Sequence, residues 1–73
     1  MTERESNFIK LAEKRVNNTI KQLRLVGNLS NKNNYMYSDS QANKIINTLN
    51  AELNEMKVRF KMHMKNKSKE FKI

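Results

Sequence analysis

Cysteine and proline are absent from this chain of 73 residues, and Gly27 is its single glycine. Without cysteine the protein has no disulfide framework, no thiolate nucleophile and no cysteine-based zinc site, which fits a cytoplasmic setting. His63 and Asp39 are each the only residue of their kind. A metal site needs at least three convergent ligands. We therefore expect a protein that is not an enzyme and that has no metal or other cofactor.

Negative charge and apolar residues are both scarce. Seven Asp and Glu stand against fifteen Lys and Arg, which leaves a net charge of +8, and 37% of the residues are hydrophobic. Such a short chain forms one small domain, which often needs oligomerisation or a ligand for stability. No apolar run approaches the ~20 residues of a membrane span. The first ten residues, MTERESNFIK, lack the apolar stretch of a signal peptide, so we expect neither segment.

Apolar residues recur with a heptad period in the first part of the chain. Thr2 and Glu5 predict a capping box, in which each residue satisfies a backbone N–H of the other. The positions that follow alternate between spacings of three and four residues, and we name them the first seam: Ile9, Ala12, Val16, Thr19, Leu23 and Val26. This period predicts a helix over about residues 3–26. Gly27 then predicts a left-handed C-terminal cap, because glycine has no Cβ to clash there.

A second helix is predicted after a polar loop over residues 27–37, where Asn and Ser favour turns. Ser38 and Gln41 form another capping box, and Tyr37 stands where a hydrophobic staple belongs. The second seam has the same heptad period: Ala42, Ile46, Leu49, Leu53, Met56 and Phe60. We predict a helix over about residues 38–66 and a basic tail over 67–73.

Residues 57–65, KVRFKMHMK, also alternate basic and apolar with a period of two, which is the pattern of a strand. Lysines recur at every fourth position here, at Lys57, Lys61, Lys65 and Lys69, which is the pattern of one helix face. We favour the helix because the chain has no second strand candidate to pair with.

Two capped helices joined by a polar loop predict an all-α fold, an antiparallel helical hairpin over residues 1–66. A lone hairpin would bury one seam on each helix and leave flanking apolar residues in water. These flanking residues are Phe8, Leu11, Ile20, Leu25 and Ile45. Pairing two hairpins covers most of that surface. We therefore predict a homodimer that forms a four-helix bundle, with a different partner over the flanks as the alternative.

Positive charge gathers in two places. Residues 57–73 carry seven Lys and Arg against Glu70 alone, a distribution typical of phosphate-backbone binding through counterion release. A solvated lysine-rich tail, or a surface for an acidic protein or a membrane, is the alternative. On the first helix a basic stripe falls within about 80°, away from the first seam. The cations of the stripe can contact phosphates while the amide of Asn17 contacts base edges in a groove. The solvent-exposed face of any lysine-rich helix has the same pattern.

These patterns give two function hypotheses. The first is nucleic-acid binding, with RNA ahead of DNA. Its predicted residues on the C-terminal ridge are Lys57, Arg59, Lys61, Lys65 and Lys69. Its predicted residues on the stripe are Lys10, Lys14, Asn17, Lys21 and Arg24. The second is a protein-interaction module, such as a small inhibitor that docks on a nucleoprotein enzyme. Its predicted contacts are Phe8, Leu11, Val58 and Met62.

Residues 15–46, RVNNTIKQLRLVGNLSNKNNYMYSDSQANKII, resemble short uncharacterised proteins of bacteria and their mobile elements. The shared feature is a helix ending in GNLSN, followed by a Tyr-containing loop and a capped second helix. In layout, though not in motif, the chain is similar to plasmid copy-control proteins. Those proteins dimerise as antiparallel helical hairpins and bind paired RNA loops. The resemblance implies a plasmid or phage regulator and transfers no catalytic residue.

Overall fold

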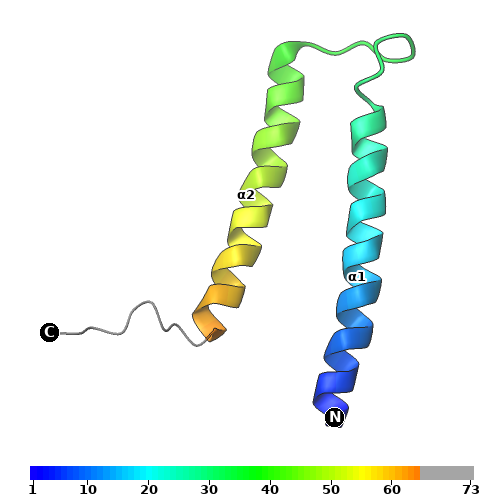
Figure 1. Cartoon of the computed structure of the whole chain (residues 1–73). Coiled ribbons are helices and arrows are strands. Elements are labelled where there is room, and N and C mark those ends of the chain that lie inside the picture. Colours follow the sequence, from blue (N-terminus) through cyan, green and yellow to red (C-terminus); the bar gives the residue numbers. More distant parts are fainter. Residues whose placement is uncertain (65–73) are drawn as a thin grey trace, which may run out of the picture. The chain divides into compact units, whose positions relative to one another are not determined.

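A computed structural model describes residues 1–64 of the chain and shows two helices in them. Helix α1 spans Glu3–Asn28 and helix α2 spans Asp39–His63, with a loop between them (Figure 1). Residues 1–64 contain no strand. The all-α class and the order of helix, loop and helix are therefore confirmed. Lys65, Lys69 and the predicted tail over 67–73 lie outside the described residues.

Helix α1 begins at the predicted residue but with half of the predicted capping box. The Thr2 hydroxyl accepts a hydrogen bond from the Glu5 N–H at 3.1 Å. The Glu5 carboxylate accepts from that same hydroxyl at 3.1 Å, instead of from the Thr2 backbone N–H. Glu3 and Glu5 also place negative charge in the first turn, where the helix dipole favours it.

The predicted left-handed cap at Gly27 is wrong. Gly27 lies inside α1, and the chain described has no residue with positive φ. The last turn instead tightens, with the N–H groups of Leu29 and Ser30 donating to the carbonyls of Val26 and Gly27, both at 3.0 Å. These short-range bonds satisfy the terminal carbonyls of the helix without a left-handed residue. The helix therefore runs two residues beyond the predicted end, to Asn28.

The connecting loop is organised by Asn31. Its side-chain oxygen accepts from the Asn33 N–H at 3.0 Å. Its backbone carbonyl accepts from the N–H groups of Asn34 and Tyr35, at 3.1 and 3.0 Å. Asparagine commonly forms such turns because its side chain can replace a backbone acceptor. The prediction of turns in this segment is confirmed.

Helix α2 begins with both halves of its capping box in place. The Ser38 hydroxyl accepts from the Gln41 N–H at 3.1 Å, and the Gln41 side chain accepts from the Ser38 N–H at 2.8 Å. Tyr37 and Ala42 are both half-buried, as a hydrophobic staple between these two positions requires. The start of α2 is therefore confirmed as the capping box predicts it.

The end of α2 comes earlier than predicted, at His63 rather than near residue 66. Met64 is the C-cap, with an extended backbone, and its N–H donates to the Lys61 carbonyl at 3.4 Å. Lys61 and His63 occupy the last turn, where a positive side chain is favoured by the helix dipole. Residues 57–63 are helical throughout, so the strand alternative is wrong for them.

No side chain among residues 1–64 is buried. Most residues of both seams are exposed, as Leu23 and Leu53 show with 48% and 49% of their surface accessible, while Ala12, Val26 and Ala42 are half-buried. Thr19, the one polar residue of the first seam, donates its hydroxyl to the Arg15 carbonyl at 2.8 Å. Its hydroxyl is thus satisfied within the helix, and burying Thr19 against a neighbouring helix leaves no unpaired donor. Each helix therefore presents an apolar face that is ready to be covered.

Replacing Ser38 with Ala tests the capping box of α2. We expect S38A to lower the free energy of unfolding by about 1 kcal/mol, because the Gln41 N–H loses the Ser38 hydroxyl as its acceptor. Thermal unfolding followed by circular dichroism measures the change. Ser40→Ala, two residues on in the same first turn, is the matched control. Equal unfolding temperatures for the two variants would contradict the cap.

Replacing Gly27 with Ala tests the end of α1. An added Cβ would meet nothing within 4 Å, and alanine favours a helix over glycine by about 1 kcal/mol. We therefore expect G27A to raise the unfolding temperature. A lower unfolding temperature would indicate the left-handed cap that the structure does not show.

Candidate nucleic-acid interface

Helix α1 carries the whole predicted basic stripe. Its members are exposed, and with 3.6 residues per turn they share one face of the helix. The stripe consists of Lys10, Lys14, Asn17, Lys21 and Arg24. The middle of this face lies about 150° round the helix from the middle of the first seam. The structure therefore brings these five predicted residues together on a surface separate from the apolar one.

Four of the five stripe residues, all except Lys10, lie in a stretch of chain without acidic residues. No Asp or Glu occurs between Lys14 and Ser38, a segment with five Lys and Arg. Lys14, Lys21 and Arg24 have no carboxylate three or four residues away, the separations at which helical side chains meet. Their charges are therefore not neutralised along the helix. The acidic residues of α1 are Glu3, Glu5 and Glu13, all in its first half.

Arg15 is a member of this acid-free segment that the sequence prediction omitted. It adds to the positive potential of α1, and it lies about 140° round the helix from the middle of the stripe. The signal that could have identified the segment is simple, namely the distance between successive acidic residues. The site prediction was based on helical periodicity and did not use it.

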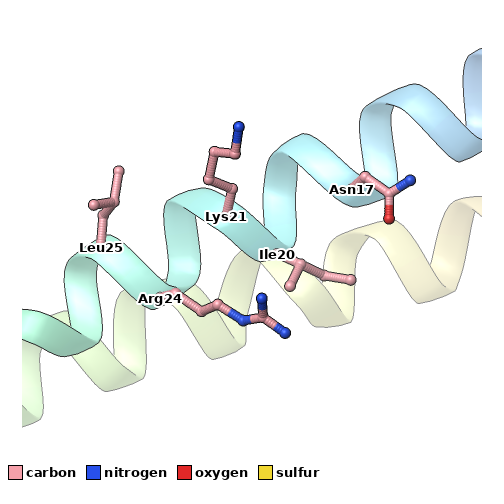
Figure 2. Close-up of a pocket in the computed structure, with 5 residues that line it drawn as sticks. All are labelled: Asn17, Ile20, Lys21, Arg24 and Leu25. Atoms are coloured by element: carbon pink, nitrogen blue, oxygen red, sulfur yellow. The ribbon is translucent and has the colours of Figure 1, made fainter.

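An open groove lies on the second half of α1. It is lined by three stripe residues and by two aliphatic residues at its edges: Asn17, Ile20, Lys21, Arg24 and Leu25. Figure 2 shows all five side chains projecting from α1, with the Lys21 amine and the Arg24 guanidinium extending in different directions. We name this surface the α1 groove. It combines two cations, one amide and two apolar edges, a mixture that the stripe pattern did not reveal.

The C-terminal cations divide between two faces of α2. Lys57 and Lys61 are four residues apart within the helix and therefore share a face. Arg59, midway between them in sequence, lies about 160–200° away round the helix. The structure thus brings together two of the five predicted ridge residues and separates Arg59 from them. The other two, Lys65 and Lys69, lie outside residues 1–64.

The four predicted protein-contact residues are exposed and fall into two pairs. Phe8 and Leu11 are three residues apart on α1, with 60% and 46% of their surfaces accessible. Val58 and Met62 are four residues apart on α2, with 51% and 75% accessible. Each pair therefore forms a small apolar patch on its own helix.

The described residues limit the chemistry of the site. Among residues 1–64, no group of three His, Asp or Glu side chains lies close enough to hold a metal ion. Neither of their helices is long and apolar enough to cross a membrane. A cluster of exposed cations without neutralising carboxylates attracts anions, and phosphate is the anion that nucleic acids present at regular spacing.

Comparison of the chain with protein-family models, with curated proteins and with solved structures found no match.

Proposed function

We propose that this protein is a small, non-enzymatic nucleic-acid-binding protein that acts as a homodimer, with RNA preferred to DNA. The observation that carries the proposal is the acid-free segment of α1, where Lys14, Lys21 and Arg24 stand on one exposed face. Each cation that contacts a phosphate releases a condensed counterion, and this release drives binding. Lys57 and Lys61 on α2 supply further phosphate contacts.

The dimer in the proposal is a four-helix bundle of two antiparallel hairpins. Its support is that most residues of both heptad seams are exposed and that apolar residues such as Ile20 and Ile45 widen the seams. A single neighbouring helix covers one narrow seam, whereas a wider stripe needs two neighbours. A two-fold bundle would also present the basic stripe twice, once to each of two segments of nucleic acid related by the same axis.

The preference for RNA rests on layout. The arrangement of two capped helices around a polar loop is similar to that of plasmid copy-control proteins, which bind RNA. On the same ground we propose a regulator of a plasmid or phage, acting in the cytoplasm. The lack of cysteine is compatible with that compartment.

A second candidate function is a protein-interaction module, such as an inhibitor that docks on a nucleoprotein enzyme. The exposed apolar pairs favour it, since Phe8 and Met62 are each at least 60% accessible and adaptable Met side chains are common at binding surfaces. In that case the basic face would follow the nucleic acid or an acidic surface of the target. Val58 and Leu11 would join the contact.

Fluorescence anisotropy tests the proposed function, using labelled duplex DNA, duplex RNA and a stem-loop RNA at low and near-physiological salt. We expect binding to an RNA form that persists at the higher salt. If the protein binds all three probes at low salt and none at the higher salt, the positive charge attracts nucleic acid without specificity. Pull-down of a protein target would then test the second candidate.

Replacing Lys21 with Gln tests whether the α1 face makes the phosphate contacts. We expect K21Q to weaken binding and to lower the slope of log affinity against log salt by about 0.7 on a single strand, or about 0.9 on a DNA duplex, the values of one phosphate contact. Lys44→Gln removes the same charge from α2 at a position outside the proposed site and serves as the control. Equal slopes for the two variants would contradict the placement on α1.

A further inference from the structure

The α1 groove differs from the rest of the basic stripe. Lys10 and Lys14 offer only ammonium groups, whereas the groove adds the Arg24 guanidinium, the Asn17 amide and the aliphatic side chains of Ile20 and Leu25. Ile20 and Leu25 remain 39% and 53% accessible. A bare phosphate gains nothing from aliphatic neighbours. A nucleobase does, because its faces are apolar and its edges form hydrogen bonds.

We infer that the α1 groove binds an unpaired nucleotide of single-stranded nucleic acid. The guanidinium of Arg24 stacks on the base, as planar guanidinium groups do on exposed bases. Ile20, one turn before Arg24 on the same side of α1, lies against one edge of the stack, and the Asn17 amide donates to and accepts from the base edge. Lys21 and Lys14 bind the phosphates on either side. This inference rests on the proposed function and names the form of nucleic acid that the same face takes.

The groove stays accessible when the apolar seam is covered. Its five residues centre about 140° round α1 from the middle of the first seam. Ile20 lies at the edge nearer the seam, and Leu25 lies at the opposite edge. In the proposed bundle a second neighbouring helix covers the side of Ile20 that faces the seam. Asn17, Lys21 and Arg24 lie farther round α1 and stay exposed to a ligand.

Base stacking predicts a preference for single strands, whereas charge alone predicts a preference for duplexes. Comparing the two affinities therefore tests the inference. A duplex carries the higher density of phosphates, so charge alone favours it over a single strand of the same length. A duplex also keeps its bases stacked on each other, so they are not free to stack on Arg24. A preference for the single strand therefore requires contacts to the base.

The experiment compares Arg24→Lys with Arg15→Lys, using anisotropy with labelled 12-nucleotide single strands and 12-base-pair duplexes, each in RNA and DNA form. Both substitutions keep the charge and replace a planar guanidinium by an ammonium. Arginine and lysine have similar helix propensities, and circular dichroism checks that the helix content is unchanged. Arg15 lies on α1 outside the groove and is the matched control.

We expect the protein to bind the single strands more tightly than the duplexes. R24K should weaken single-strand binding at least about fivefold, the low end for loss of one stacked base, with duplex binding unchanged. R15K should behave as the unmodified protein. If R24K weakens binding of the RNA strand more than that of the DNA strand, the groove also contacts the ribose 2′-hydroxyl. If both strands lose affinity equally, the groove contacts only the base and the phosphates.

Two results would overturn the inference while the proposed function stands: tighter binding of the duplexes, or equal single-strand affinities for R24K and R15K. Failure of the unmodified protein to bind any of the four probes at low salt would overturn the proposed function itself. Asn17→Ala gives a second check, because it removes the amide that bonds the base edge and leaves every charge in place. We expect it to weaken single-strand binding alone.

Discussion

Covering two apolar seams is the condition on which this fold depends. Helices α1 and α2 hold 26 and 25 residues, and helices of this length gain most of their stability from packing of an apolar face. None of residues 1–64 is buried, so the local bonds of caps and turns must be supplemented by contacts to other helices. Those contacts have to offset the conformational entropy lost on folding.

The same helix that needs a packing partner also carries the charged face. On α1 the seam and the stripe lie about 150° apart, so the surface proposed for packing is separate from the surface proposed for binding. The acid-free segment that begins at Lys14 leaves Lys14, Lys21 and Arg24 without a neutralising carboxylate, while Glu3 and Glu5 stay at the N-terminal end, where they stabilise the helix. Stability and binding are thus assigned to different residues of one helix.

Most of the local structure could be predicted from the sequence, because it depends on neighbours in the chain. Heptad spacing located both helices, and Ser38 with Gln41 fixed the start of α2. The prediction at Gly27 was wrong because glycine can adopt a left-handed cap but does not require one. Hydrogen bonds between residues three apart end the helix instead. The α1 groove was not foreseen, since a stripe pattern counts charged positions and ignores the aliphatic side chains between them. How the seams are covered depends on contacts between helices, which spacing alone does not determine.

Sedimentation equilibrium combined with circular dichroism over a dilution series tests the central claim most directly, that a second copy of the chain covers the seams. The account predicts a mass of two chains at micromolar concentration, and a loss of helix content that accompanies dissociation on dilution. A monomer that keeps its full helix content at the lowest concentration would contradict it.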